Sequence, residues 1–272
     1  MRSAFAFMAL AGLLSMAGLP AQAPAGVPGT QGPVTAPSTT QAKPAAAPVS
    51  VWQQEFEARM LTDFGWLARF KEADLALGPP AAGEDRVVFM GDSITESWKI
   101  EGRAGYFPGK AYINRGISGQ TTPQMLVRFR QDVIDLRPKA VVILGGVNDI
   151  AGNTGPMTLE QTEGNLASMA DLAAANNIRV VLCSVLPAVD FRWRPGLTPA
   201  PKIVALNEWI KAYATEKGHV YVDFHTAMKD QRDGLPASLS ADGVHPLPAG
   251  YAVMAPLVEA GIEKALKAGN RE

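Results

Sequence analysis

The fold of this chain is decided by the stretch Arg86-Val-Val-Phe-Met-Gly-Asp-Ser93. Its run of consecutive apolar residues, Val87 to Met90, is typical of a strand buried on both faces of a parallel sheet. Gly91 then interrupts the apolar run, and Asp and Ser are residue types that cap helices. The stretch therefore predicts a buried strand that turns sharply into a helix, with Ser93 at the turn.

Further apolar runs follow downstream and alternate with helical patterns. The short runs are rich in Val and Ile, and the stretches between them carry apolar residues at intervals of three and four. Strands that alternate with helices indicate a parallel sheet covered on both faces. We therefore expect an α/β protein, a three-layer α/β/α sandwich with about five parallel strands. The expected strands are Arg86–Met90, Ala111–Ile113, Ala140–Leu144, Arg179–Val185 and Val220–Asp223, and the expected helices are Thr122–Leu136, Leu159–Asn176, Pro201–Lys217 and Leu247–Ala268.

The N-terminal region differs in composition from the rest of the chain. Arg2, the uncharged apolar run 4–18 and the small-residue pattern Ala21-Gln-Ala23 predict a signal peptide over residues 1–23. Residues 24–50 are rich in Ala, Pro, Thr and Gln, which predicts a disordered linker. We expect an exported protein, periplasmic or secreted, without stable membrane insertion once the signal peptide is cleaved.

A single globular domain is expected over residues 51–272. It begins with apolar residues at helical spacing, which predict an amphipathic helix over residues 52–77 that ends before Gly78-Pro-Pro80. Cys183 is the only cysteine, so no internal disulfide is possible, and its apolar surroundings predict a buried strand residue.

Composition and motifs exclude several classes of partner. The formal net charge is -1 and no Lys/Arg cluster stands out, so we expect no nucleic-acid partner. No Gly-x-Gly-x-x-Gly pattern follows the first strand and no phosphate-binding loop is present, which argues against a nucleotide cofactor. The three histidines lack metal-ligand spacing. We therefore expect neither a cofactor nor a metal ion.

Polar candidates follow the carboxyl ends of the expected strands. Gly91-Asp-Ser93 follows the first, Asn114–Gln120 the second, Gly145–Asp149 the third, and Asp242-Gly-Val-His245 lies beyond the fifth. Ligands of open parallel sheets bind beyond these ends. All of these segments are therefore expected at one edge of the sheet.

The residue types at this edge fit acyl transfer, which needs a nucleophile, a base, a group that orients the base, and donors for the oxyanion. Ser93 is the candidate nucleophile, His245 the candidate base and Asp242 its orienting partner. The Ser93 amide, the Gly119 amide and the Asn148 side chain are candidate oxyanion donors.

These segments resemble the four sequence blocks of the SGNH (GDSL-type) hydrolase family. The matching residues are Gly91-Asp-Ser93, Ile117-Ser-Gly119, Gly146-Val-Asn-Asp149 and Asp242-Gly-Val-His245, in the family's order, with Ile94 where the family pattern has Leu. The resemblance implies a flavodoxin-like sandwich and a metal-free serine esterase with the roles given above. The surrounding sequence looks most like bacterial relatives of platelet-activating-factor acetylhydrolase and carbohydrate acetylesterases. It therefore implies short acyl esters, acetyl above all, on carbohydrate as the substrate.

Other functions remain open at this point. The same triad would serve a lysophospholipase, a thioesterase or an acyltransferase, and a non-catalytic carbohydrate-binding protein could retain the fold. Asp92 and Asp149 as a glycosidase pair would leave Ser93, His245 and Asn148 without a purpose.

Three further residues are expected as possible substrate contacts. These are Asp92 beside the nucleophile, Trp98 after it, and Trp193 on the long loop Leu186–Pro201.

Overall fold

Parallel pairing organises the sheet, which has the strand order β2-β1-β3-β4-β5. The computed structural model describes residues 50–98 and 107–268. Within them the strands are β1 (Val87–Gly91), β2 (Tyr112–Gly116), β3 (Ala140–Leu144), β4 (Arg179–Cys183) and β5 (Val220–Val222). In β1, Gly91 is aligned with Gly116 of β2 and with Leu144 of β3. The carboxyl ends of these three strands therefore lie at one edge, as expected.

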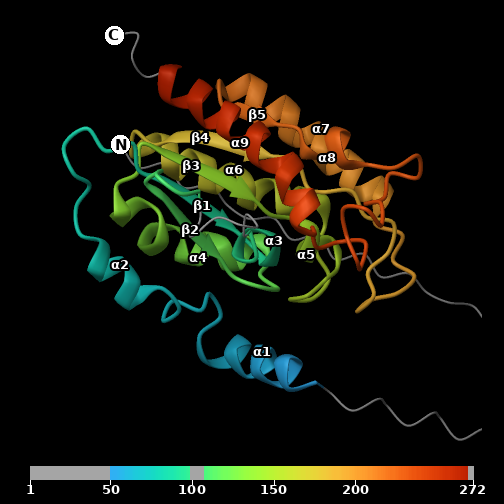
Figure 1. Ribbon diagram of the computed structural model, residues 1–272. Coiled ribbons are helices and arrows are strands. Elements are labelled where there is room, and N and C mark those ends of the chain that lie inside the picture. Colours follow the sequence, from blue (N-terminus) through green and yellow to red (C-terminus); the bar gives the residue numbers. More distant parts are fainter. Residues whose placement is uncertain (1–49, 99–106, 269–272) are drawn as a thin grey trace, which may run out of the picture. The chain divides into compact units, whose positions relative to one another are not determined.

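Helices cover both faces of the sheet, which confirms the three-layer α/β/α architecture (Figure 1). On one face α4 (Thr122–Asp132), α6 (Leu159–Ala175) and α7 (Ala200–Lys217) pack in sequence, with the short helix α5 (Val147–Ile150) against α7. On the other face lie α3 (Ser93–Glu96), α8 (Phe224–Met228) and α9 (Pro248–Ala268). The expected helix 122–136 stops at Asp132 and is followed by a 3₁₀ turn, Ile134–Leu136.

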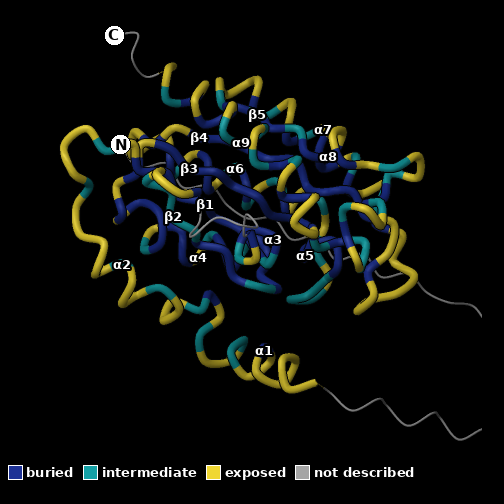
Figure 2. Tube along the Cα trace, in the orientation of Figure 1, coloured by how far each residue is buried: buried dark blue, intermediate teal, exposed yellow. Residues whose placement is uncertain are grey.

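The core consists of the strands and the inward faces of these helices (Figure 2). Every residue of β1 is buried, because helices cover it on both faces. Cys183 is buried at the end of β4, and burial raises the pKa of its thiol. The thiol is therefore protonated and unreactive.

The N-terminal segment departs from the predicted single helix over residues 52–77. It forms two helices, α1 (Val51–Thr62) and α2 (Lys71–Leu77). Asp63 ends α1, since its carboxylate accepts hydrogen bonds from the backbone amides of Leu67 and Ala68, at 2.8 and 3.0 Å. Such side chain–backbone bonds compete with helix continuation.

The described residues begin at Ser50, which is the last residue of the predicted linker. Ser50, which the prediction placed in the linker, caps α1 by accepting a hydrogen bond from the Gln53 amide at 3.2 Å. The predicted signal peptide (1–23) and the rest of the predicted linker (24–49) lie outside the described residues. Among the described residues, no helix combines the length and apolar character needed to cross a membrane.

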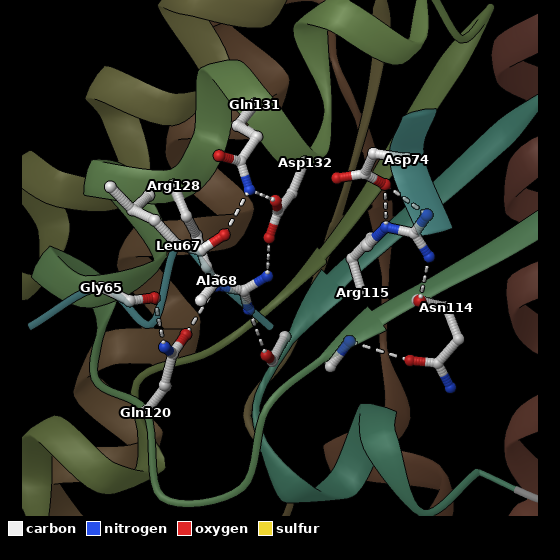
Figure 3. Close-up of polar contacts among 12 residues, drawn as sticks. Gly65, Leu67, Ala68, Asp74, Asn114, Arg115, Gln120, Arg128, Gln131 and Asp132 are labelled. Atoms are coloured by element: carbon white, nitrogen blue, oxygen red, sulfur yellow. Dashed lines mark hydrogen bonds and ion pairs between the residues drawn. The ribbon is translucent and has the colours of Figure 1, made fainter. Parts of the chain in front are cut away.

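Three glutamines hold the segment between α1 and α2 against the domain. The Nε2 groups of Gln120, Gln124 and Gln131 donate to backbone carbonyl oxygens of residues 65, 64 and 67, at 2.9, 2.7 and 2.8 Å respectively. The first of these bonds is drawn in Figure 3. The chain preceding the sheet is therefore fixed to α4 and to the loop before it.

Arg128 of α4 is fully buried and joins three parts of the fold (Figure 3). Its guanidinium donates to Gln120 Oε1 at 2.6 Å, to Asp132 Oδ2 at 2.8 Å and to the Gly91 carbonyl oxygen at 3.0 Å. A buried charge requires such partners, since desolvation otherwise destabilises it by several kcal/mol. This network connects the end of β1 to the loop after β2.

Removal of Arg128 is expected to destabilise the fold strongly. An Arg128→Met variant leaves the Asp132 carboxylate buried without its cation, which should lower the free energy of unfolding by about 3–5 kcal/mol. The double variant Arg128→Met/Asp132→Leu should recover part of this loss. Urea unfolding measures both values.

Lys139 provides the matched control, because its ion pair with Asp85 is exposed. Lys139→Met should lower the free energy of unfolding by less than about 1 kcal/mol. An equally small loss in Arg128→Met would contradict a structural role for the buried network.

Candidate active site

Ser93 lies at the turn from β1 into α3. Gly91 permits this turn, since a Cβ there would lie 2.1 Å from Thr95 Oγ1 and 2.8 Å from the Leu144 carbonyl oxygen. Asp92 caps the short helix by accepting a hydrogen bond from the Ile94 amide at 2.9 Å. The Ser93 side chain is left partly exposed at the sheet edge.

Ser93, His245 and Asp242 form a continuous hydrogen-bonded chain. Ser93 Oγ lies 2.9 Å from His245 Nε2, and His245 Nδ1 lies 2.6 Å from Asp242 Oδ2. If Nδ1 carries the ring proton, it donates to the carboxylate, and Nε2 is left to accept the serine proton. The structure thus brings together the three residues that the sequence predicts as nucleophile, base and orienting group.

The Asp242 carboxylate is fixed from several directions. Its Oδ1 accepts from the amides of Val244 and His245, at 2.9 and 2.8 Å, and from Ser240 Oγ at 3.1 Å. Partial burial alone would raise the pKa of Asp242, but the hydrogen bonds from the His245 ring and from the two amides outweigh it and hold that pKa below its ordinary value. The carboxylate is therefore ionised at neutral pH and stabilises a charged imidazole.

Two amide groups predicted as oxyanion donors lie beside Ser93. Gly119 has φ +80°, a left-handed conformation that favours glycine. Asn148 is buried on α5, and one of its Nδ2 hydrogens is used by the Gln120 carbonyl oxygen at 3.0 Å. Asn148 also lines the cavity described below, and its amide has a second Nδ2 hydrogen that can serve a ligand there.

Asn153 orients Asn148 and is a site residue that the sequence analysis missed. Its Nδ2 donates to Asn148 Oδ1 at 2.9 Å and to the Gly119 carbonyl oxygen at 3.1 Å. By occupying Oδ1, it fixes which end of the Asn148 amide can donate. The only sequence signal for Asn153 is its place in a Gly- and Thr-rich turn after the expected third block, a composition that by itself indicates only a turn.

Trp193 closes another side of the site. Its Nε1 donates to Asn153 Oδ1 at 3.2 Å, and its ring centroid lies 6.2 Å from that of His245. The neighbouring arginines attach the loop to the rest of the site: Arg192 donates to the Ala241 carbonyl oxygen at 2.9 Å and Arg194 to that of Gly152 at 3.3 Å.

These side chains surround a cavity of about 310 Å³. This volume is at the lower end of the range for small-molecule sites. Among the described residues that line the cavity there is no aspartate, glutamate, lysine or arginine. These lining residues are Trp52, Ser93, Ser118, Gly119, Asn148, Asn153, Trp193 and His245. The site therefore suits a neutral ligand.

Two predicted substrate contacts lie elsewhere. Trp98 is 2% exposed and packs among the rings of Phe89, Phe224 and Tyr251 in the core, so the prediction of a contact with substrate is wrong. Asp92 is 1% exposed and caps α3, so it does not reach the cavity either.

Asp149, the other acid of the glycosidase alternative, is also buried outside the cavity. Its carboxylate accepts from the Thr122 amide at 3.0 Å and from the Thr122 hydroxyl. It therefore joins α5 to the start of α4. In the described part of the chain, no three His, Cys, Asp or Glu residues form a group that could hold a metal ion.

The comparisons with known proteins agree with this architecture. The chain belongs to the GDSL-like lipase/acylhydrolase family, whose model matches residues 89–253. It is thus a carboxylic ester hydrolase of the SGNH/GDSL class.

Individual relatives give the same picture. A GDSL-like lipase from Bacteroides thetaiotaomicron, known from a crystal structure, has 46% sequence identity to this chain. The match has a TM-score of 0.72 and covers 75% of this chain and 100% of that chain. An acetylxylan esterase from Geobacillus stearothermophilus is 25% identical, covering 63% of this chain and 90% of its own length. The esterase TesA of Pseudomonas aeruginosa is 28% identical, covering 63% of this chain and 85% of its own length.

Asp92 is expected to make stability depend on pH. Burial raises the pKa of Asp92 to about 7, whereas an unfolded aspartate titrates near 3.9. Between these values the native state binds the extra proton, so the free energy of unfolding falls as the pH rises from about 4 to 7 and this contribution is constant above 7. An Asp92→Asn variant lacks this titration. The free energy of unfolding of the variant minus that of wild type should therefore be larger at pH 8 than at pH 5.

Urea unfolding of both proteins at the two pH values measures the effect. Titrations of groups that do not interact with Asp92 cancel in the difference between wild type and variant, whereas His245 and Asp149 interact with it electrostatically. A difference that stays the same at pH 5 and pH 8 would contradict the raised pKa.

Proposed function

We propose that this chain hydrolyses short-chain acyl esters through an acyl-serine intermediate, with Ser93 as nucleophile, His245 as base and Asp242 as orienting group. The carrying observation is the 2.9 Å contact between Ser93 Oγ and His245 Nε2, with His245 Nδ1 held by Asp242. A nucleophile and a base within hydrogen-bond reach, with the base oriented by a third group, is the arrangement that activates a serine.

In the first half of the reaction, Ser93 Oγ attacks the ester carbonyl carbon as its proton passes to His245 Nε2. The tetrahedral intermediate collapses, the bond to the alkoxy oxygen breaks, and His245 returns the proton to the departing alcohol. Asp242 stabilises the imidazolium that exists between these steps. The products of this half are a free alcohol and an acyl ester on Ser93.

The developing negative charge is stabilised by amide donors. The backbone amides of Ser93 and Gly119 and the Nδ2 group of Asn148 take this role. Asn153 fixes the Asn148 amide by binding its Oδ1, so that Nδ2 is the end that can donate. Donors that are fixed before the reaction stabilise the transition state more than donors that must reorganise.

Water completes the cycle. His245 removes a proton from a water molecule, which attacks the acyl carbonyl carbon, and the same donors hold the second oxyanion. Collapse breaks the bond to Ser93 Oγ, and His245 returns the proton to that oxygen. The carboxylic acid leaves and the free serine is restored.

The proposed substrate is an acetyl or similarly short acyl ester on a carbohydrate. The uncharged cavity of about 310 Å³ and its two tryptophans support a small acyl group on a neutral alcohol. The acetylxylan esterase among the relatives favours the same class, at 25% identity. The similarity to the esterase TesA keeps longer acyl chains as the alternative.

Substitution of Ser93 tests the proposal. In p-nitrophenyl ester assays from acetyl to octanoyl, the wild type should hydrolyse acetyl fastest, and Ser93→Ala should lose activity by a factor of roughly 10³ or more, because the acyl acceptor is gone. Ser97→Ala, at an exposed serine just after the same short helix, should retain wild-type rates.

Each outcome of this assay has a distinct meaning. Equal rates in wild type and Ser93→Ala would overturn the mechanism, and an octanoyl optimum would overturn the short-chain specificity. Addition of an alcohol acceptor separates hydrolysis from acyl transfer, since a transferase would yield a new ester in place of the free acid.

We also propose that the protein is exported to the periplasm or secreted, with residues 1–23 as a cleaved signal peptide. The proposal rests on the charged, apolar and small-residue order of that segment. After expression of the full chain in a Gram-negative bacterium, mass spectrometry of the periplasmic fraction should find a chain shortened by about 23 residues. Recovery of the intact chain from the cytoplasm alone would refute it.

A further inference from the structure

Trp52 reaches the candidate active site from a part of the chain that the family match does not include. The matched residues are 89–253, and Trp52 lies on α1, well before them. Nevertheless it lines the same cavity as Ser93 and His245. The site therefore includes a residue of the N-terminal segment, outside the residues that the family model matches.

Local packing holds the Trp52 indole in place. The ring stacks on Phe56 with centroids 5.2 Å apart and an interplanar angle of 19°. Phe56 is the one residue of α1 that is buried, so it anchors the helix. A Cβ built on Gly119 would lie 3.0 Å from Trp52 Cζ2, which places the edge of the indole directly over the candidate oxyanion loop.

The rest of the N-terminal segment supports this position. The glutamine bonds from residues 120, 124 and 131 fix the chain just after α1 to the domain. Gln120 also follows Gly119 directly and is itself held by Arg128. The position of α1 is thus tied to the same loop that carries the candidate oxyanion donor.

Trp193, like Trp52, is stacked on a buried phenylalanine. It stacks on the buried Phe191, with centroids 5.0 Å apart and an interplanar angle of 23°. Trp52 is 49% exposed and Trp193 41% exposed, although both line the cavity. Each indole therefore has one face supported by a phenylalanine and an exposed part available to a ligand.

We infer that Trp52 and Trp193 form a binding platform for the sugar ring that carries the ester, and that Trp52 determines the preference for such substrates. The C–H faces of a pyranose ring pack on indole rings, and its hydroxyl and ester oxygens can be bonded by the neutral Ser and Asn groups of the cavity. An ionic headgroup would find no opposite charge among these lining residues. The inference rests on the proposed esterase function and assigns its alcohol-side specificity.

The test compares two acetate esters in the full chain. Peracetylated methyl β-D-xylopyranoside offers a sugar ring, and ethyl acetate offers the same acyl group without a ring. Trp52→Ala should lower kcat/KM for the sugar ester relative to ethyl acetate by roughly three- to tenfold, mainly through KM, because an aromatic contact is lost. Trp52→Phe should recover part of the ratio.

Leu61→Ala is the matched control. Leu61 lies on the same helix, is 91% exposed and is not among the residues that line the cavity. This variant should keep the wild-type ratio of the two esters. An unchanged ratio in Trp52→Ala, or an equal change in Leu61→Ala, would overturn the assignment.

A binding measurement separates this inference from the proposed function. Calorimetric titration of the sugar ester into Ser93→Ala and into Ser93→Ala/Trp52→Ala should show a Kd roughly three- to tenfold higher in the double variant. If the wild type hydrolyses neither ester, the esterase proposal fails while the titration still decides the role of Trp52. Equal affinities, or no binding to Ser93→Ala, would overturn the platform itself.

Discussion

Parallel pairing of β1 with β2 on one side and β3 on the other is the constraint on which the site depends. The register aligns Gly91 with Gly116 and Leu144, so the chain leaves all three strands at the same level. Ser93, Gly119 and Asn148 each follow one of these strand ends within a few residues. Short loops are therefore enough to bring all three to the same cavity. The same geometry explains why ligands of open parallel sheets bind at this edge.

Arg128 connects two of these strand ends through hydrogen bonds. Its guanidinium bonds the carbonyl oxygen of Gly91 and the side chain of Gln120, so it spans the two strand ends that carry the candidate nucleophile and an oxyanion donor. Asp132 supplies the opposite charge within the same helix. Because the ion pair is fully buried, both charged groups need their hydrogen-bond partners, and these partners include the end of β1 and the loop after β2.

The sequence was sufficient for those features that depend on local patterns. The existence and order of the strands were predictable from their apolar runs, although β2 extends to Gly116, beyond the predicted end at Ile113, and β4 ends at Cys183, before the predicted end at Val185. The grouping of Ser93, Asp242 and His245 was predictable from their places after strands. Features that depend on tertiary packing could not be predicted from the sequence. The helix predicted over residues 52–77 is divided at Asp63, whose carboxylate binds amides ahead of it. Trp98, predicted to touch substrate, belongs to the aromatic core, and nothing in the pattern around Trp52 or Asn153 indicated that either would reach the site.

The hydrogen bond from Trp193 Nε1 to Asn153 Oδ1 connects a residue of the cavity wall to the residue that orients Asn148. Trp193 contacts the space where a substrate would lie, while Asn153 sets the orientation of the Asn148 amide. Replacement of Trp193 would also remove one of the hydrogen bonds of Asn153, which would then be held only by its bonds to Asn148 and Gly119. Ring carbons of Trp52 lie where a Cβ on Gly119 would project, and among the described residues Trp52 has no hydrogen bond to Asn153 or Asn148. Substitution of Trp52 is therefore expected to disturb the orientation of Asn148 less than substitution of Trp193.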